Sequence, residues 1–194
     1  MPDPLPLPDY RISEQYPEAA ALIRKWESVN QSGKPHLTPY PEYGGNKYVA
    51  GFGRTIDNDK KDIPWTVEQS EADLDIQMME GLKDISRLEK ELPEGMLFTY
   101  SEREALIPFM QNVGYKNLID TEAVKALREG DKKRFAFELF DAEQGFTKGT
   151  KEGDTDVLGG LVTRRGEEEA LFFREYNTGG MVQRNPYPYM ARPI

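Results

Sequence analysis

The chain has 194 residues, of which 38% are hydrophobic and 11% aromatic, enough to bury the core of one compact domain and to exclude wholesale disorder. Its 34 acidic residues outnumber the 25 lysines and arginines, and the formal net charge of −9 argues against a nucleic-acid-binding protein, which normally carries a basic surface. Because the chain contains no cysteine, disulfides, thiolate metal sites and cysteine nucleophiles are excluded.

Both ends of the chain are expected to be irregular. Residues 1–13, MPDPLPLPDYRIS, contain four prolines, which favours an extended proline-rich arm. The start lacks the basic region that opens a Sec signal peptide. Residues 179–194 form a similarly irregular tail, so we expect the folded domain to occupy residues 14–178.

The first half of the domain alternates between helical and strand signals. Residues 14–28 are predicted to form a helix whose apolar face contains Ala19, Leu22, Ile23, Trp26 and Val29. Glycine, proline, asparagine and tyrosine then interleave with KYVAGFG over residues 33–55, which predicts short antiparallel strands and turns. A long helix is expected over residues 66–92, with Thr66 as its N-cap and Gln69 completing a capping box.

The second half of the domain reads as a helical bundle. Helices are expected at residues 101–114, 120–129, 131–141 and 157–176, separated by Gly114, Gly130 and the loop GFTKGTKEGDTDVLGG. The order of elements predicts a helix-rich α+β protein. It would have two lobes, at about residues 14–65 and 93–178, joined by the helix over residues 66–92.

Six groups of segments resemble the phage-type lysozymes, the muramidases of glycoside hydrolase family 24. They are LIRKWE, YPEYGG with YVAGFGRT, TVEQSEADLDIQ, ALIPFMQNVG, AVKALREGDKKRFAFELF and VLGGLVTRRGEEEALFF. They follow the family order from about residue 19 to about residue 175. The resemblance implies a two-lobed lysozyme fold with an active-site cleft between the lobes, peptidoglycan as the substrate, and no cofactor.

The resemblance places the general acid at Glu27 and the second carboxylate at Glu42. Cleavage of the β-1,4 bond between N-acetylmuramic acid and N-acetylglucosamine needs an acid that protonates the leaving oxygen. It also needs a carboxylate that activates water on the opposite face of the sugar. The family usually has aspartate where Glu42 stands, after a shorter loop, and Asp57 in GRTID is the alternative second carboxylate.

Val49 departs from the family pattern, which usually has a threonine there whose hydroxyl helps to hold the attacking water. Valine cannot form that hydrogen bond, and three explanations stay open. Thr38 or Tyr48 places the water instead, or the substrate attacks itself as in a single-acid lytic transglycosylase. In the third, activity is reduced or lost, as in a non-catalytic wall-binding or virion structural protein.

By the same resemblance, polar residues at three positions line the sugar cleft: Thr55, Gln111 and Thr121. Gly51 and Gly53 allow close backbone approach at the cleft floor. Arg164 and Arg165 match an arginine pair that organises the site and lobe closure. The alternative for this pair is an ordinary surface ion pair with Glu168 or Glu169 at helical spacing.

Other kinds of site are not supported. His36, the only histidine, is flanked by glycine and prolines and is expected to be a solvated loop residue. No metal site is expected, since there is no HExxH motif and DNDKKD lacks the glycine and glutamate of an EF-hand loop. We therefore expect a monomer without a membrane span, made in the bacterial host cytoplasm without a Sec signal. It would act on peptidoglycan in the periplasm after delivery by a holin, a virion or a secretion system.

Overall fold

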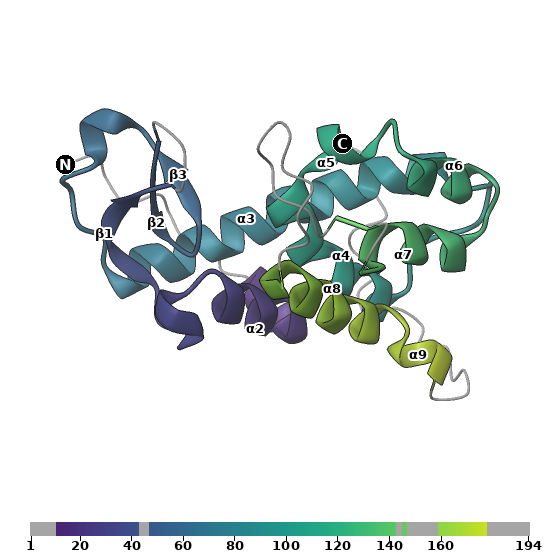
Figure 1. Cartoon of the computed structure of the whole chain (residues 1–194), viewed down its shortest axis with the longest axis horizontal. Helices are drawn as coiled ribbons and strands as arrows, with labels where there is room; N and C mark the ends of the chain where they lie inside the picture. The colour runs from purple at the N-terminus through teal and green to yellow at the C-terminus, as the bar shows by residue number, and fades with distance from the viewer. Residues whose placement is uncertain (1–10, 43–46, 143–144, 147–158, 178–194) are drawn as a thin grey trace. The chain divides into compact units, whose positions relative to one another are not determined.

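The computed structural model describes residues 11–42, 47–142, 145–146 and 159–177 (Figure 1). Most of the expected proline-rich arm and all of the expected tail lie outside these residues. The chain divides into two compact units, Met1–Gly81 and Leu82–Ile194, and the boundary falls inside the long helix α3 (Val67–Leu88). Each unit is described by itself.

The first unit begins with two short helices, α1 (Ile12–Gln15) and α2 (Pro17–Trp26). The single helix predicted over residues 14–28 is therefore wrong. Tyr16 separates the two helices with φ −125° and ψ 67°, because the residue before a proline is disfavoured in the helical region. The proline itself starts α2, a position where its missing N–H costs no hydrogen bond.

Helix α2 buries one side through Ala19, Ala20 and Ile23, each with no exposed surface. Ala19 and Ile23 confirm part of the predicted apolar face. Val29 does not belong to it, because α2 has already ended and Val29 opens the short 3-10 helix η1 (Val29–Gln31), where it is 37% exposed. The loop that follows α2 is held by hydrogen bonds from Gly33 N to Ser28 Oγ and from Val29 N to Lys34 O.

Three antiparallel strands follow in the order β1 (His36–Pro41), β2 (Tyr48–Gly51) and β3 (Arg54–Ile56), as predicted for this region (Figure 1). The ladder pairs Tyr40 with Val49 and Val49 with Thr55. Residues directly opposite one another in a sheet point to the same face, so these three side chains form one row. Tyr48 pairs with Pro41 and Ile56 and therefore belongs to the other face.

Gly51, at the end of β2, has a structural reason to be glycine. Its φ is +61°, and a Cβ atom placed there would lie 3.1 Å from the Trp65 ring. Both the backbone conformation and the space favour the residue without a side chain. Gly53 also has a positive φ, of +82°, at the turn between β2 and β3.

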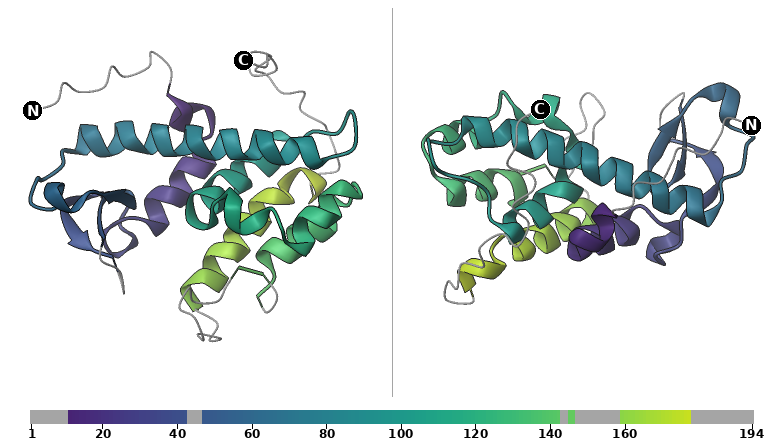
Figure 2. Two further views of the ribbon diagram at one scale, coloured as in Figure 1. Left: turned by 90° about the horizontal axis from the view of Figure 1, so that it is seen from above. Right: turned by 180° about the vertical axis from the view of Figure 1, so that it is seen from behind.

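Helix α3 starts with the predicted capping box. Gln69 N donates to Thr66 Oγ1 at 3.1 Å, and Thr66 N donates to Gln69 Oε1 at 2.8 Å. The helix has 22 residues, about 33 Å at 1.5 Å per residue, and the views in Figure 2 follow it without a break. It is shorter than the predicted span of 66–92. The chain tightens into the 3-10 helix η3 (Glu89–Glu91) and becomes extended at Leu92, the residue before a proline.

The second unit is a helical bundle, as predicted. Its helices are α4 (Tyr100–Val113), α5 (Tyr115–Leu118), α6 (Glu122–Arg128), α7 (Lys132–Phe140), α8 (Gly159–Phe172) and α9 (Arg174–Asn177). Helix α5 was not predicted, and the single helix predicted over residues 157–176 is interrupted after α8. Phenylalanines fill the core: the Phe109 ring meets that of Phe140 edge-on with 5.7 Å between centroids, and Phe172 lies 5.9 Å from Phe140.

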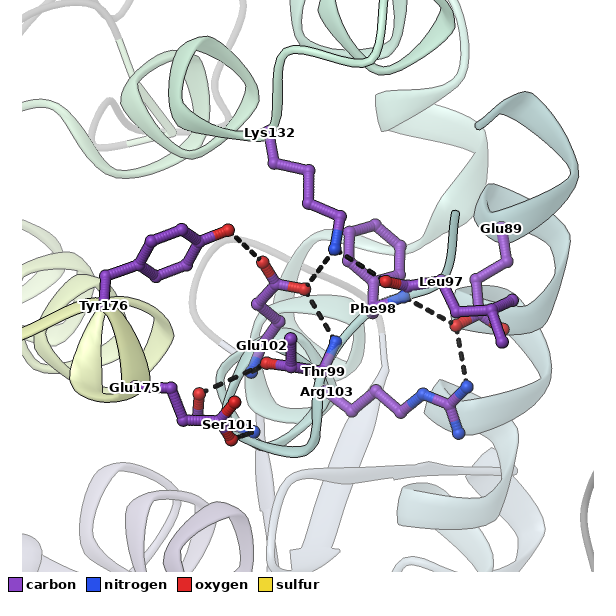
Figure 3. Close-up of polar contacts among 10 residues, drawn as sticks. All are labelled: Glu89, Leu97, Phe98, Thr99, Ser101, Glu102, Arg103, Lys132, Glu175 and Tyr176. Atoms are coloured by element: carbon purple, nitrogen blue, oxygen red, sulfur yellow. Dashed lines mark hydrogen bonds and ion pairs between the residues drawn. The ribbon is translucent and has the colours of Figure 1, made fainter. Parts of the chain in front are cut away.

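A buried carboxylate, Glu102, joins three helices of the second unit (Figure 3). It accepts hydrogen bonds from Thr99 N in the α4 cap, from Lys132 Nζ at the start of α7, and from the Tyr176 hydroxyl in α9, each 2.7 Å long. Burial, together with the Glu102 carboxylate, raises the pKa of Tyr176, so its phenol stays a hydrogen-bond donor. The cluster ties the end of the described chain to the bundle.

Candidate active site

Glu27, the expected general acid, is the residue that ends helix α2. It serves as the C-cap with φ −100° and ψ 11°, and its N–H donates to Ile23 O at 2.9 Å. The residue is half-buried, and its carboxylate acts electrostatically on both His36 and Tyr40. The end of the helix therefore fixes the Glu27 backbone.

His36 is the first residue of β1, and its ring is half-buried. The imidazole has a hydrogen bond to the Ser28 backbone, and its centroid lies 4.3 Å from that of the Tyr40 ring, with 41° between the planes. Burial lowers the pKa of His36, against the raising effects of Glu27 and Ser28. The prediction of a solvated loop histidine is wrong, because the loop folds back and strand pairing with Gly51 takes His36 into the sheet.

The charges of both expected catalytic carboxylates act on Tyr40. Burial raises its pKa most, and the charges of Glu27 and Glu42 raise it further. Glu42 directly follows β1, is exposed, and continues the ladder through a 2.9 Å hydrogen bond from its N–H to Lys47 O. The structure thus places Tyr40 and Glu42 two residues apart on β1 and its extension. The sequence signal for Tyr40 was its place two residues before Glu42, because such residues share a face of a strand.

The other residues considered for the chemical step lie differently. Asp57 has a side chain that is 75% exposed and forms an ion pair with Lys60 Nζ at 3.0 Å. Val49 is 7% exposed and lies in the row between Tyr40 and Thr55. Of the two alternative water-holding residues, Thr38 is exposed in β1, and Tyr48 belongs to the sheet face opposite that of Val49.

The three expected sugar contacts are divided between the units. Thr55 is exposed on β3 of the first unit, whereas Gln111 and Thr121 belong to the second. Gln111 Oε1 accepts a hydrogen bond from Arg164 at 3.1 Å. Thr121 donates to Leu118 O at 2.7 Å and lines a pocket of about 200 Å³ together with Glu122, Glu138 and Phe146.

Arg164 and Arg165 are buried in the second unit, with 4% and 0% of their surface exposed. Both form ion pairs with Glu168, which is fully buried. The expected ion pairs with Glu168 are therefore present, but the prediction that they lie on the surface is wrong, because all three side chains are buried. Arg164 also donates to Pro108 O at 3.0 Å, and the Arg165 guanidinium stacks 4.7 Å from the centre of the Phe109 ring.

Two further findings concern the part of the chain that the structure describes. Within it, no group of three or more histidine, cysteine, aspartate or glutamate side chains is arranged to hold a metal ion. None of the helices in the same residues combines the length and the apolar character that crossing a membrane requires.

A helix-rich α+β chain with a small antiparallel sheet, a long helix and a helical bundle has the fold of a lysozyme, and comparisons with solved structures agree. The muramidase domain of SpmX from Asticaccaulis excentricus matches with a TM-score of 0.63 at 21% identity, over 79% of this chain and 93% of that one. The active form of the P1 phage endolysin Lyz matches with a TM-score of 0.62 at 18% identity, over 82% of this chain and 84% of that one. An endolysin from the Escherichia coli O157:H7 phage FAHEc1 matches with a TM-score of 0.58 at 24% identity, over 80% of this chain and 90% of that one.

The sequence identifies the family more closely than the fold does. Residues 24–168 match the phage lysozyme family, and the chain belongs to that family. It is therefore a glycoside hydrolase, and its substrate is peptidoglycan. No curated protein matches the chain.

Proposed function

We propose that the protein cleaves the β-1,4 bond between N-acetylmuramic acid and N-acetylglucosamine, with Glu27 as general acid and Glu42 as general base. The observation that carries the proposal is that two carboxylates of the first unit stand at the ends of elements within the residues that match the family: Glu27 caps α2, and Glu42 continues the ladder directly after β1. Family membership supplies the substrate class.

The proposed reaction uses two proton transfers. Glu27 gives its proton to the glycosidic oxygen as the bond from that oxygen to the anomeric carbon breaks and oxocarbenium character develops. A water molecule on the opposite face of the sugar attacks the anomeric carbon and gives a proton to Glu42. The product is a reducing muramic acid end with inverted configuration.

Glu42 is preferred to Asp57 as the second carboxylate because of their surroundings. Asp57 is paired with Lys60 and its side chain is 75% exposed. Glu42 directly follows β1, extends its ladder through the hydrogen bond to Lys47 O, and has no ion pair within the described residues.

The proposal is tested by the loss of turbidity of chloroform-permeabilised Gram-negative cells. Glu27→Gln and Glu42→Gln should each clear the suspension on the order of 100-fold more slowly than the wild type, since each removes one proton transfer. Asp57→Asn is the matched control, with an equivalent loss of charge, and should clear at the wild-type rate. If Glu27→Gln clears as fast as the wild type, the assignment of the acid is wrong.

A second candidate, a single-acid lytic transglycosylase, is favoured by Val49. This side chain, on the sheet face shared with Tyr40, has no group that can hold a water molecule. In such an enzyme a hydroxyl of the substrate attacks the anomeric carbon, so Glu42 would be dispensable. The products distinguish the two candidates: hydrolysis gives a reducing muramic end, and transglycosylation gives a 1,6-anhydro end.

The substrate also suggests where the protein acts, because peptidoglycan lies outside the cytoplasmic membrane. We propose delivery from the bacterial host cytoplasm to the periplasm by a holin, a virion or a secretion system. We also propose a monomer, since Glu27 and Glu42 come from one unit of one chain. Fractionation of producing cells with and without a holin tests the first proposal, and light scattering after size exclusion tests the second.

A further inference from the structure

We propose that the Tyr40 hydroxyl holds the attacking water beside Glu42, a role that the neighbouring Val49 side chain cannot fill. The inference rests on the proposed function, which assigns Glu27 and Glu42 but gives Tyr40 no part in the reaction. Tyr40 would be a catalytic residue, because it would contact the water that reacts.

The attacking water needs more than one partner. A carboxylate accepts one of its hydrogens, and the molecule can still turn about that single bond. A second hydrogen bond fixes the direction in which the oxygen lone pair points. A misplacement of about 1 Å at such a step can reduce the rate on the order of 100-fold.

The sheet register determines which side chains are available for this contact. Tyr40, Val49 and Thr55 form one row on one face of the sheet. Glu42 lies two residues beyond Tyr40, and its N–H continues the ladder, so its side chain points to the same face. Val49 carries no donor or acceptor on its side chain. Two residues of the row carry a hydroxyl, Tyr40 and Thr55, and of these Tyr40 lies on the strand that leads into Glu42.

The surroundings of Tyr40 suit a neutral hydrogen-bonding group. Partial burial, followed by the charges of Glu27 and Glu42, raises its pKa, so the phenol keeps its proton. A neutral phenol can accept one hydrogen of the water and donate its own O–H to a carboxylate oxygen. The residue is 37% exposed, which leaves part of it open to solvent.

His36 holds the Tyr40 ring in place and is a positioning residue. Its imidazole contacts the tyrosine ring at 4.3 Å between centroids and is anchored by its hydrogen bond to the Ser28 backbone, one residue after Glu27. The irregular register between His36 and Tyr40 brings the two rings together, although a regular strand would separate residues four apart by about 13 Å. The end of α2 and the Tyr40 ring are thereby connected through one side chain.

The step balances without a further reactant. The water oxygen bonds to the anomeric carbon while the bond to the leaving oxygen breaks, and its electron pair stays on that oxygen. Glu27 supplies the proton to the leaving oxygen, and Glu42 takes one proton from the water. Tyr40 forms hydrogen bonds throughout and exchanges no proton, so it needs no separate regeneration.

The test removes one hydroxyl from each face of the sheet. Tyr40→Phe keeps the ring against His36 and should lower kcat on purified sacculi on the order of 100-fold, with KM within about twofold. Tyr48→Phe makes the same change on the opposite face and should leave both constants within about twofold. The double variant Tyr40→Phe with Val49→Thr restores a hydroxyl at the neighbouring position. Its kcat should be at least about tenfold higher than that of Tyr40→Phe alone.

The positioning role of His36 is tested in the same series. His36→Asn should lower kcat when Tyr40 is present and have no further effect in Tyr40→Phe, because the two residues would act through one contact. Equal losses in both backgrounds would contradict this role. Thermal melts of each variant show whether it is folded.

The outcomes separate this inference from the proposed function. Full activity of Tyr40→Phe together with inactive Glu27→Gln and Glu42→Gln overturns the inference alone. A loss of kcat in Thr55→Val with no loss in Tyr40→Phe also overturns the inference. It would assign the water-holding role to Thr55, which pairs with Val49 from strand β3. Full activity of Glu27→Gln overturns the proposed function, whatever the tyrosine variant does.

Discussion

Replacing Glu102 by glutamine tests what the buried cluster of the second unit contributes to stability (Figure 3). The substitution keeps the shape of the side chain and removes its charge. The amide oxygen can still accept from Thr99 N and Lys132 Nζ, and the Tyr176 hydroxyl can turn to accept from the new amide group. The main loss is therefore the ion pair with Lys132.

The size of the loss follows from burial. The Glu102 and Lys132 side chains are 0% and 11% exposed, so the lysine charge would remain in the interior without its counter-charge. Breaking a buried ion pair costs about 3–5 kcal/mol. Because Lys132 Nζ keeps its 2.6 Å hydrogen bond to Leu97 O, we expect a loss of about 2–3 kcal/mol. This corresponds to a fall in Tm of roughly 4–12 °C for a chain of this size.

The measurement is thermal unfolding followed by circular dichroism at neutral pH. Glu122→Gln is the matched control, because Glu122 forms exposed ion pairs with Lys125 and Arg134, and its Tm should stay close to the wild-type value. Removing both charges of the buried pair, as Glu102→Gln with Lys132→Met, should recover much of the loss. A fall in Tm no larger for Glu102→Gln than for Glu122→Gln would refute the reasoning.

Three other predictions follow from the first unit and the net charge. Gly51→Ala should lower the free energy of unfolding in urea by about 1–3 kcal/mol, because Gly51 has a positive φ and an added Cβ would contact Trp65. Gly166→Ala in α8 is the control and should not lower it, because the space around Gly166 is open. Equal effects of the two substitutions would contradict this reasoning. Because burial lowers the pKa of His36 below 6.5, the unfolded chain takes up a proton first as the pH falls. The free energy of unfolding should therefore decline below about pH 6.5, and it should decline less steeply in His36→Gln. Parallel curves of unfolding free energy against pH for the two proteins would exclude His36 as the cause. The charge of −9 repels an anionic wall, so clearing of cells should quicken between about 10 and 150 mM salt, and slower clearing would count against repulsion.

The parts of the fold that depend on neighbouring residues were predictable from the sequence. The capping box of Thr66 and Gln69 was predicted and observed, because both partners lie within one helical turn. The burial of one face of α3 also follows from local spacing, and Leu74, Met78 and Leu88 have no exposed surface. The break at Tyr16 was missed because the apolar spacing continues across it, although the following proline gave a local signal.

The parts that depend on distant contacts were not predictable. His36 was interpreted as a loop residue from its glycine and proline neighbours, but its pairing with Gly51 sets its place in the sheet. Arginines are rarely buried, so residue type alone could not place Arg165 in the core. Its burial depends on contacts with the Phe109 ring and the Phe146 carbonyl, from segments far away in the chain.

The proposed acid, base and water-holding hydroxyl come from residues 27–42, a single stretch of the first unit. Their spacing is therefore set by local structure: the end of α2 fixes Glu27, and the ladder of β1 fixes Tyr40 and Glu42. Gln111 and Thr121, the expected sugar contacts of the second unit, belong to a different set of helices. The proposal therefore assigns the transfer of protons to side chains of the first unit, and it assigns to Gln111 and Thr121 of the second unit only the binding of the glycan.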